Sequence, residues 1–151
     1  MSIGMEKILI SACLVGDKVK YDGKSNYNPL IRDLLEHYEL VPFCPEVEGG
    51  LSIPRKPSEI KGEKVINDAG KDVTNFFVSG AKKALQICQY LNIKIAVMKE
   101  KSPSCGSKQI HDGSFSNRLI AGEGITTHLL RQNGIRVISE EELEDFLNEL
   151  K

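Results

Sequence analysis

The sequence predicts an α/β protein: a three-layer α/β/α sandwich, Rossmann-like, with a mainly parallel four-stranded sheet and an inserted loop or hairpin. Four short runs are rich in Ile, Val and Leu and almost continuously apolar, which is typical of strands covered on both faces. Helical patterns separate these runs, and the alternation favours parallel strands with crossover helices. At 151 residues and 40% apolar composition, we expect a single domain over residues 1–151.

The strands are predicted at residues 7–12, 40–43, 93–98 and 135–138. The helices between and after them are predicted at residues 28–38, 74–92, 124–134 and 139–150. Asn28 precedes Pro29 as a candidate N-cap, and Thr74 is a candidate cap for the second helix. Gly134 is expected just beyond the third helix, and Ser139 with Glu142 forms a capping-box pattern at the fourth.

Residues 45–73 are too long for a simple connection and contain several Gly and Pro residues. A small hairpin is expected within residues 64–73, turning around Ala69 and Gly70. Long ordered insertions often carry function, so this segment is a candidate pocket wall or lid.

Charge and hydropathy argue against nucleic acid or a membrane as a partner. Twenty Lys and Arg residues balance 21 Asp and Glu residues, and neither sign forms a long run. The apolar stretch at the beginning of the sequence is interrupted by Ser11, is shorter than the ~20 residues of a spanning helix, and lacks the features of a signal peptide. We therefore expect a cytoplasmic protein; no pattern indicates an oligomeric state.

Three of the four cysteines follow predicted strands. Cys13 follows the first strand, Cys44 the second, and Cys105 lies in the polar loop after the third. Ligand sites in open α/β sheets gather at the carboxyl ends of strands, so these cysteines are expected to converge. Cys88 instead falls on the apolar face of a helix between Leu85 and Leu91, as a buried structural thiol does.

Converging thiolates suit more than one chemistry. No C-x-x-C pair indicates structural zinc, but catalytic zinc and an iron–sulfur cluster with one open iron both fit three soft ligands. A metal-free alternative is a nucleophilic Cys105 activated by His111 or His128. A purely structural alternative is that Cys13 and Cys44 bind nothing and are small apolar residues at the ends of core strands.

Four sequence blocks, in order, resemble the thiouracil desulfidase family, long catalogued as a domain of unknown function. They are "SACLVGDKVKYDG", "FCPEVEGGLSIPRKPSEI", "SPSCGSKQIHDGSF" and "GEGITTHLLRQNGIRVISEEEL", and the likeness runs from about residue 8 to residue 146. The resemblance implies a [4Fe-4S] cluster held by Cys13, Cys44 and Cys105. It also implies non-redox removal of sulfur from 2-thiouracil or a related thiolated base, with release of hydrogen sulfide.

The same resemblance assigns the catalytic acid to Glu46 and the catalytic serine to Ser102. On residue type alone, Glu46 is also consistent with a solvated loop carboxylate, Ser102 with a turn former, and Glu48 with the acid. Further candidates for substrate binding are Gly49 and Gly50, which allow close approach of the backbone to a flat ring, together with Tyr21, Asp22, Arg55 and Glu59. The main rival function is a non-catalytic metal-binding protein or sulfur carrier that uses the same three cysteines.

Overall fold

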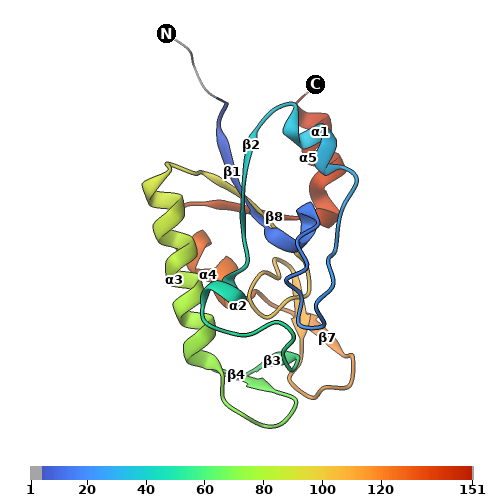
Figure 1. Cartoon of the computed structure of the whole chain (residues 1–151), viewed down its shortest axis with the longest axis vertical. Helices are drawn as coiled ribbons and strands as arrows, with labels where there is room; N and C mark the ends of the chain where they lie inside the picture. Colours follow the sequence, from blue (N-terminus) through green and yellow to red (C-terminus); the bar gives the residue numbers. More distant parts are fainter. Residues whose placement is uncertain (1–4, 151) are drawn as a thin grey trace.

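The computed structural model describes residues 5–150, and its centre is a four-stranded parallel sheet (Figure 1). The predicted domain range of 1–151 therefore includes residues 1–4 and 151, which lie outside the described residues. The strands are β1 (Lys7–Ser11), β2 (Glu39–Phe43), β5 (Ile95–Met98) and β8 (Arg136–Ser139), in the order β2-β1-β5-β8. The four predicted strands and their parallel pairing are confirmed.

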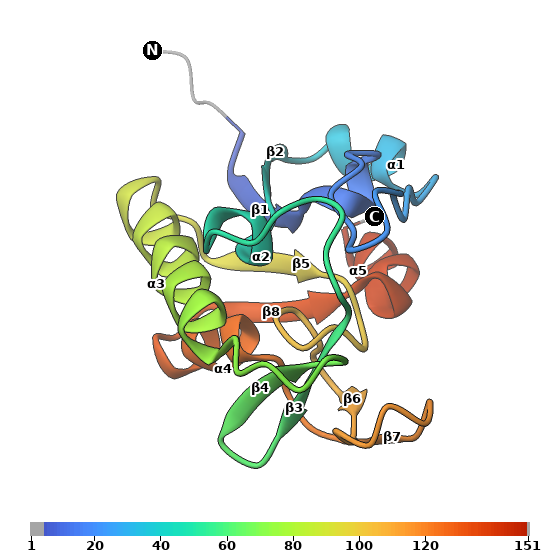
Figure 2. The same ribbon diagram turned by 60° about the horizontal axis from the view of Figure 1, so that its bottom comes forward.

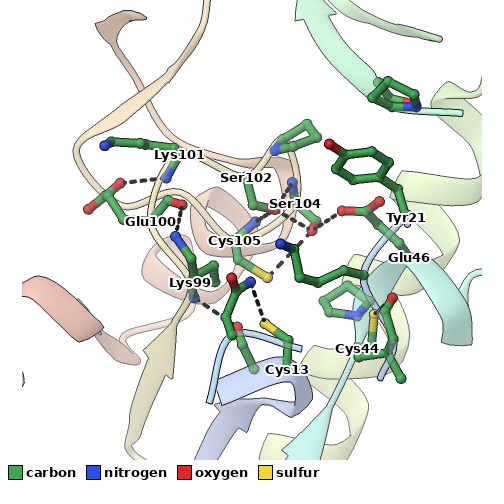
Figure 3. A pocket seen from close by; sticks show the side chains of 18 of the residues that line it. Cys13, Tyr21, Cys44, Glu46, Lys99, Glu100, Lys101, Ser102, Ser104 and Cys105 are labelled. Carbon is green, nitrogen blue, oxygen red and sulfur yellow. Dashed lines mark hydrogen bonds between the residues drawn. The ribbon is translucent and has the colours of Figure 1, made fainter. Parts of the chain in front are cut away.

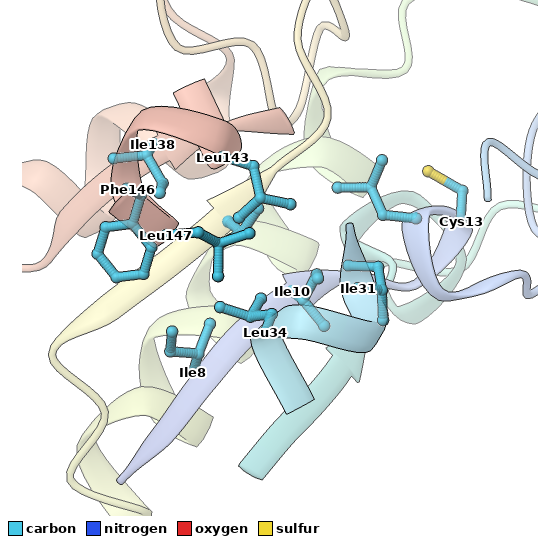
Figure 4. Packing of buried hydrophobic residues seen from close by; sticks show 11 residues of the cluster. Ile8, Ile10, Cys13, Ile31, Leu34, Ile138, Leu143, Phe146 and Leu147 are labelled. Carbon is cyan, nitrogen blue, oxygen red and sulfur yellow. The ribbon is translucent and has the colours of Figure 1, made fainter. Parts of the chain in front are cut away.

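One face of the sheet is covered by two short helices, α1 (Ile31–Leu35) and α5 (Leu143–Glu149). Ile8 and Ile10 of β1 pack there against Leu34 of α1 and against Phe146 and Leu147 of α5 (Figure 4). The 3₁₀-helix η2 (Glu140–Glu142) leads into α5 and begins with the predicted capping box. Burial of these branched and aromatic side chains holds the layer on the sheet.

The opposite face carries α3 (Thr74–Tyr90) and α4 (Ile125–Gln132), which complete the three-layer sandwich (Figure 2). Leu9 and Ala96 of the sheet pack against Ala84 and Cys88 of α3 and Leu130 of α4. Cys88 is 1% exposed, so the prediction of a buried thiol on this helix face is confirmed. Among the described residues, no helix combines the length and apolar character needed to cross a membrane.

Two predicted N-caps are wrong. The first helix begins at Ile31, because the Asn28 side chain accepts a hydrogen bond from the Leu30 amide (3.0 Å) and closes a turn before the helix. Leu35, the last residue of the helix, is 52% exposed. Thr74 is inside α3, and its hydroxyl accepts a hydrogen bond from the Val65 amide.

Two hairpins lie beside the sandwich. The inserted segment forms β3 (Ser58–Lys61) and β4 (Lys64–Asn67), which are joined by a turn at Gly62. Around Ala69 and Gly70, where the hairpin turn was expected, the chain forms only an isolated β-bridge between Ile66 and Asp72. A second hairpin, β6 (Gln109–His111) and β7 (Leu119–Ala121), was not predicted. Both hairpins lie together at the bottom of Figure 2, below the parallel sheet.

Candidate functional site

A cavity of about 460 Å³ opens at the carboxyl ends of β1, β2 and β5. The chain leaves β1 toward β2 on one side, whereas β5 lies on the other side of β1, so the order of strands reverses at this point. Such reversals are where open α/β sheets bind ligands. The predicted convergence is present, because Cys13, Cys44 and Cys105 all line this cavity (Figure 3).

Each cysteine reaches the cavity on a different element. Cys13 lies in the 3₁₀-helix η1 (Ala12–Val15) directly after β1, and its sulfur accepts a hydrogen bond from the Asn26 side-chain amide at 3.5 Å. Cys44 follows β2 and precedes α2 (Pro45–Glu48). Cys105 lies in the loop after β5 and is 5% exposed. The three thiols are therefore fixed by the sheet itself and by its first connections.

The three thiols are free; Cys13 and Cys105 are buried, and Cys44 is partly buried. Burial raises the pKa of Cys13 and of Cys44, and it raises the pKa of Cys105 to about 12. Among residues 5–150, no group of three His, Cys, Asp or Glu side chains is gathered closely enough to hold a single metal ion. The three sulfurs instead border the wider cavity.

The loop that carries Cys105 is built around the carboxylate of Glu100, a residue 1% exposed at the end of β5. This carboxylate accepts hydrogen bonds from the amides of Lys101, Ser107, Lys108 and Gln109 and from the Ser107 hydroxyl, at 2.7–3.2 Å. Burial alone would raise the pKa of Glu100, but these donors outweigh it and lower the pKa to about 2. A buried anion thus fixes the shape of the loop.

Glu46 stands in the first turn of α2, two residues after Cys44, with its carboxylate directed into the cavity. Its Oε1 accepts a hydrogen bond from Arg55 Nε at 3.1 Å, and its Oε2 accepts one from Ser104 Oγ at 2.9 Å. Arg55 is itself held by the carbonyl oxygens of Val19 and Ser52. Both oxygens of Glu46 are therefore oriented by neighbours, and the hydrogen bond from Ser104 is drawn in Figure 3.

Ser102 lines the cavity in the turn before Cys105. Its Oγ accepts hydrogen bonds from the amides of Ser104 (3.1 Å) and Cys105 (3.0 Å) and lies 2.9 Å from Ser104 Oγ. The hydroxyl is thus held at a defined position in the wall of the cavity.

Other predicted residues divide into those that line the cavity and those that do not. Tyr21 lines it while 44% exposed, and Glu59 lines it while accepting hydrogen bonds from the amides of Gly113 and Phe115. His111 also lines it, whereas His128 pairs with Glu123 outside it.

Three predicted substrate-binding residues and the alternative acid lie outside the cavity lining. Asp22 accepts a hydrogen bond from the Lys24 amide in a surface turn. Gly49 packs against α3, where a Cβ atom would lie 2.0 Å from the Phe76 carbonyl oxygen, and Gly50 adopts a φ of +110° at the end of α2. These glycines serve chain packing and turning. Glu48, weighed against Glu46 as the acid, also lies outside the lining.

Sequence reasoning missed Ser104, Asn26 and Glu100. Glu100 is a charged residue two positions after a buried strand, so a local signal existed for it, whereas the contact of Ser104 with Glu46 spans 58 positions of the chain. Asn26 had no local signal, because its contact with Cys13 depends on the path of the loop between β1 and α1.

Together, the fold and the site define a class: a Rossmann-like α/β domain with a three-thiol site and an oriented carboxylate at the point where the strand order reverses. The chain belongs to the 2-thiouracil desulfurase family, whose model matches residues 8–142. It is 42% identical over 150 residues to the uncharacterized protein YbbK of Bacillus subtilis (strain 168), covering 93% of this chain and 99% of the relative.

A solved structure agrees with this assignment. The [4Fe-4S]-dependent thiouracil desulfidase TudS matches with a TM-score of 0.90 and 46% sequence identity, covering 96% of this chain and 97% of that chain. The resemblance predicted from the four sequence blocks is therefore confirmed at the level of family and fold.

Proposed function

We propose that this chain is a [4Fe-4S]-dependent desulfidase that hydrolyses 2-thiouracil or a related thiolated base. The carbon–sulfur double bond is replaced by a carbon–oxygen bond from water, which yields the oxo base and hydrogen sulfide without net oxidation or reduction. Family membership and the TudS match support this function. The observation that carries it is the meeting of three cysteines, Glu46 and Ser102 at one cavity.

The donor set fits the cofactor. Cys13, Cys44 and Cys105 would hold the cluster, because three soft sulfur donors border a cavity much wider than one ion, and Cys88 is packed away in the core. When bound, a cluster with three cysteine ligands supplies an iron that acts as a soft Lewis acid toward a thiocarbonyl sulfur. Asn26 orients the sulfur of Cys13 by donating to it.

Glu46 is the proposed general base and acid. Its carboxylate faces the cavity and accepts the proton of the water that attacks the ring carbon, then returns that proton as the sulfur leaves. Arg55 keeps the carboxylate turned toward the substrate, so its role is to position Glu46 rather than to bind the ring. Ser102 is the proposed catalytic serine, and its hydroxyl lies in the wall of the cavity.

The proposed substrate is a small molecule that enters past the exposed ring of Tyr21, which can stack on a flat base. The cavity is bounded by the inserted segment, which contributes Pro45, Glu46, Arg55, Pro57, Ser58 and Glu59. This supports a role for that segment as a pocket wall. We propose a cytoplasmic location, where the three thiols stay reduced.

Anaerobic reconstitution tests the function. The protein is loaded with iron and sulfide, its visible absorption is recorded, and release of sulfide and uracil from 2-thiouracil is measured. Glu46→Gln is expected to keep the cluster and lose about 10²–10⁴-fold in kcat, whereas Glu48→Gln, outside the cavity lining, serves as the matched control.

The rival functions give different results. Cluster uptake without turnover on any thiolated base contradicts the proposal and favours the metal-binding or sulfur-carrier alternative. Turnover that survives without iron and depends on Cys105 alone favours a cysteine nucleophile.

A further inference from the structure

We propose that Ser104 is a positioning residue that couples Glu46 to Ser102 through a chain of hydroxyl groups. This inference rests on the proposed function and extends it to a residue that neither the sequence blocks nor the family resemblance singled out. Ser104 is 1% exposed, and its Oγ lies 2.9 Å from Glu46 Oε2 and 2.9 Å from Ser102 Oγ. It is thus placed between the two groups.

The number of hydrogens on each group fixes the direction of the chain. A serine hydroxyl carries one hydrogen and two lone pairs, and an ionised carboxylate only accepts. Ser104 therefore donates its hydrogen to Glu46, and Ser102 must be the donor in the hydrogen bond between the two serines. Because Ser102 Oγ also accepts from the amides of Ser104 and Cys105, all of its hydrogen-bonding capacity is then used within the protein.

This network fixes the two groups relative to one another. Ser104 Oγ donates to Glu46 Oε2 and accepts the hydrogen of Ser102, so one hydroxyl orients both side chains. Without it, the Glu46 carboxylate would keep, among the described residues, only the hydrogen bond from Arg55, and the hydrogen of Ser102 would lose its acceptor. Ser104 thus positions the general base and the serine together.

The contact with Cys105 gives the same residue a fixed place near the thiols. Ser104 Oγ lies 3.4 Å from Cys105 Sγ, and the Ser104 carbonyl oxygen accepts hydrogen bonds from the amides of Thr126 and Thr127 at the beginning of α4. The backbone of Ser104 is therefore held by α4 independently of its hydroxyl. Removal of the hydroxyl should leave the loop in place and break only the link between Glu46 and Ser102.

The test is a set of variants in the reconstituted enzyme, with kcat expressed per bound cluster. Ser104→Ala is expected to lower kcat about 10–100-fold, part of the range for general acid–base catalysis, with KM changed less than about threefold. Ser104→Thr keeps the hydroxyl and is expected to restore most of kcat. In a double-mutant cycle, Ser104→Ala should add little to the loss already caused by Ser102→Ala, because both break the same chain.

Ser139→Ala is the matched control, since it removes another buried serine hydroxyl, at the start of η2. It should lower the free energy of unfolding of the cluster-free protein while kcat per cluster is retained. Ser104→Ala should show the opposite pattern, with iron per chain and unfolding close to those of the wild type.

Wild-type kcat in Ser104→Ala, or losses that simply add in the double variant, overturn the role of Ser104. A fall in kcat that only follows loss of iron or of stability also overturns it. Absence of turnover in the wild type is a different result, because it refutes the proposed function itself.

Discussion

Replacement of Glu100 by Gln should destabilise the loop that carries Cys105. Its carboxylate accepts five hydrogen bonds from Lys101, Ser107, Lys108 and Gln109 while almost fully buried. Its pKa falls from an ordinary 4.5 to about 2 on folding, and one pKa step corresponds to about 1.4 kcal/mol. The ionised carboxylate therefore contributes about 3 kcal/mol to folding at neutral pH, and Glu100→Gln removes this contribution.

The sign follows from the lowered pKa. The contribution is fully present above the unfolded pKa and is lost as pH falls through the folded pKa, so the difference between wild type and variant should be constant near neutrality and shrink between about pH 4.5 and 2. Urea unfolding of the cluster-free proteins at several pH values measures it. Glu63→Gln, at an exposed position in the turn of the β3–β4 hairpin, is the control and should change stability by less than about 0.5 kcal/mol. A difference below 1 kcal/mol at neutral pH, or one that does not shrink in acid, would refute the reasoning.

Three further predictions concern other parts of the structure. Cys88→Ala should bind as much iron as the wild type and lose about 1 kcal/mol of stability, whereas Cys13→Ala should lose the cluster. Iron analysis and urea unfolding of both variants test this difference. Gly80→Ala should cost about 1–3 kcal/mol in urea unfolding, because its Cβ atom would lie 1.9 Å from the Pro45 carbonyl oxygen, and an unchanged midpoint contradicts this packing. Glu59→Gln should speed amide hydrogen exchange in the loop between β6 and β7, since its carboxylate holds two amides of that loop; unchanged exchange argues against the link.

The parallel sheet was predictable because β1, β5 and β8 are buried on both faces and therefore read as continuous apolar runs, while the partly buried β2 keeps a short run of the same kind. The start of α1 was not, because the side chain of Asn28 competes with the helix for backbone amides, and propensity alone does not decide that competition. The β6–β7 hairpin was missed since each of its strands has only three residues, too few for alternation to show.

The functional site was also predictable only in part. The three cysteines were predictable from their places at strand ends, a property of the topology. The neighbours that orient the reacting groups were not predictable from local sequence, because Ser104 meets Glu46 across 58 positions of the chain and only the finished fold brings them together. Arg55 was predicted as a pocket residue, but its contact with Glu46 depends on the path of the inserted segment.

The strand order also sets when the site can exist during synthesis. β1 is made first but is flanked by β2 on one side and β5 on the other, so its second neighbour emerges from the ribosome only after some two-thirds of the chain has been made. A nascent chain that ends before Cys105 carries two of the three thiols beside an unpaired strand edge. Binding of a cluster by all three thiols therefore requires that synthesis has passed Cys105, after the strand that completes the pairing of β1.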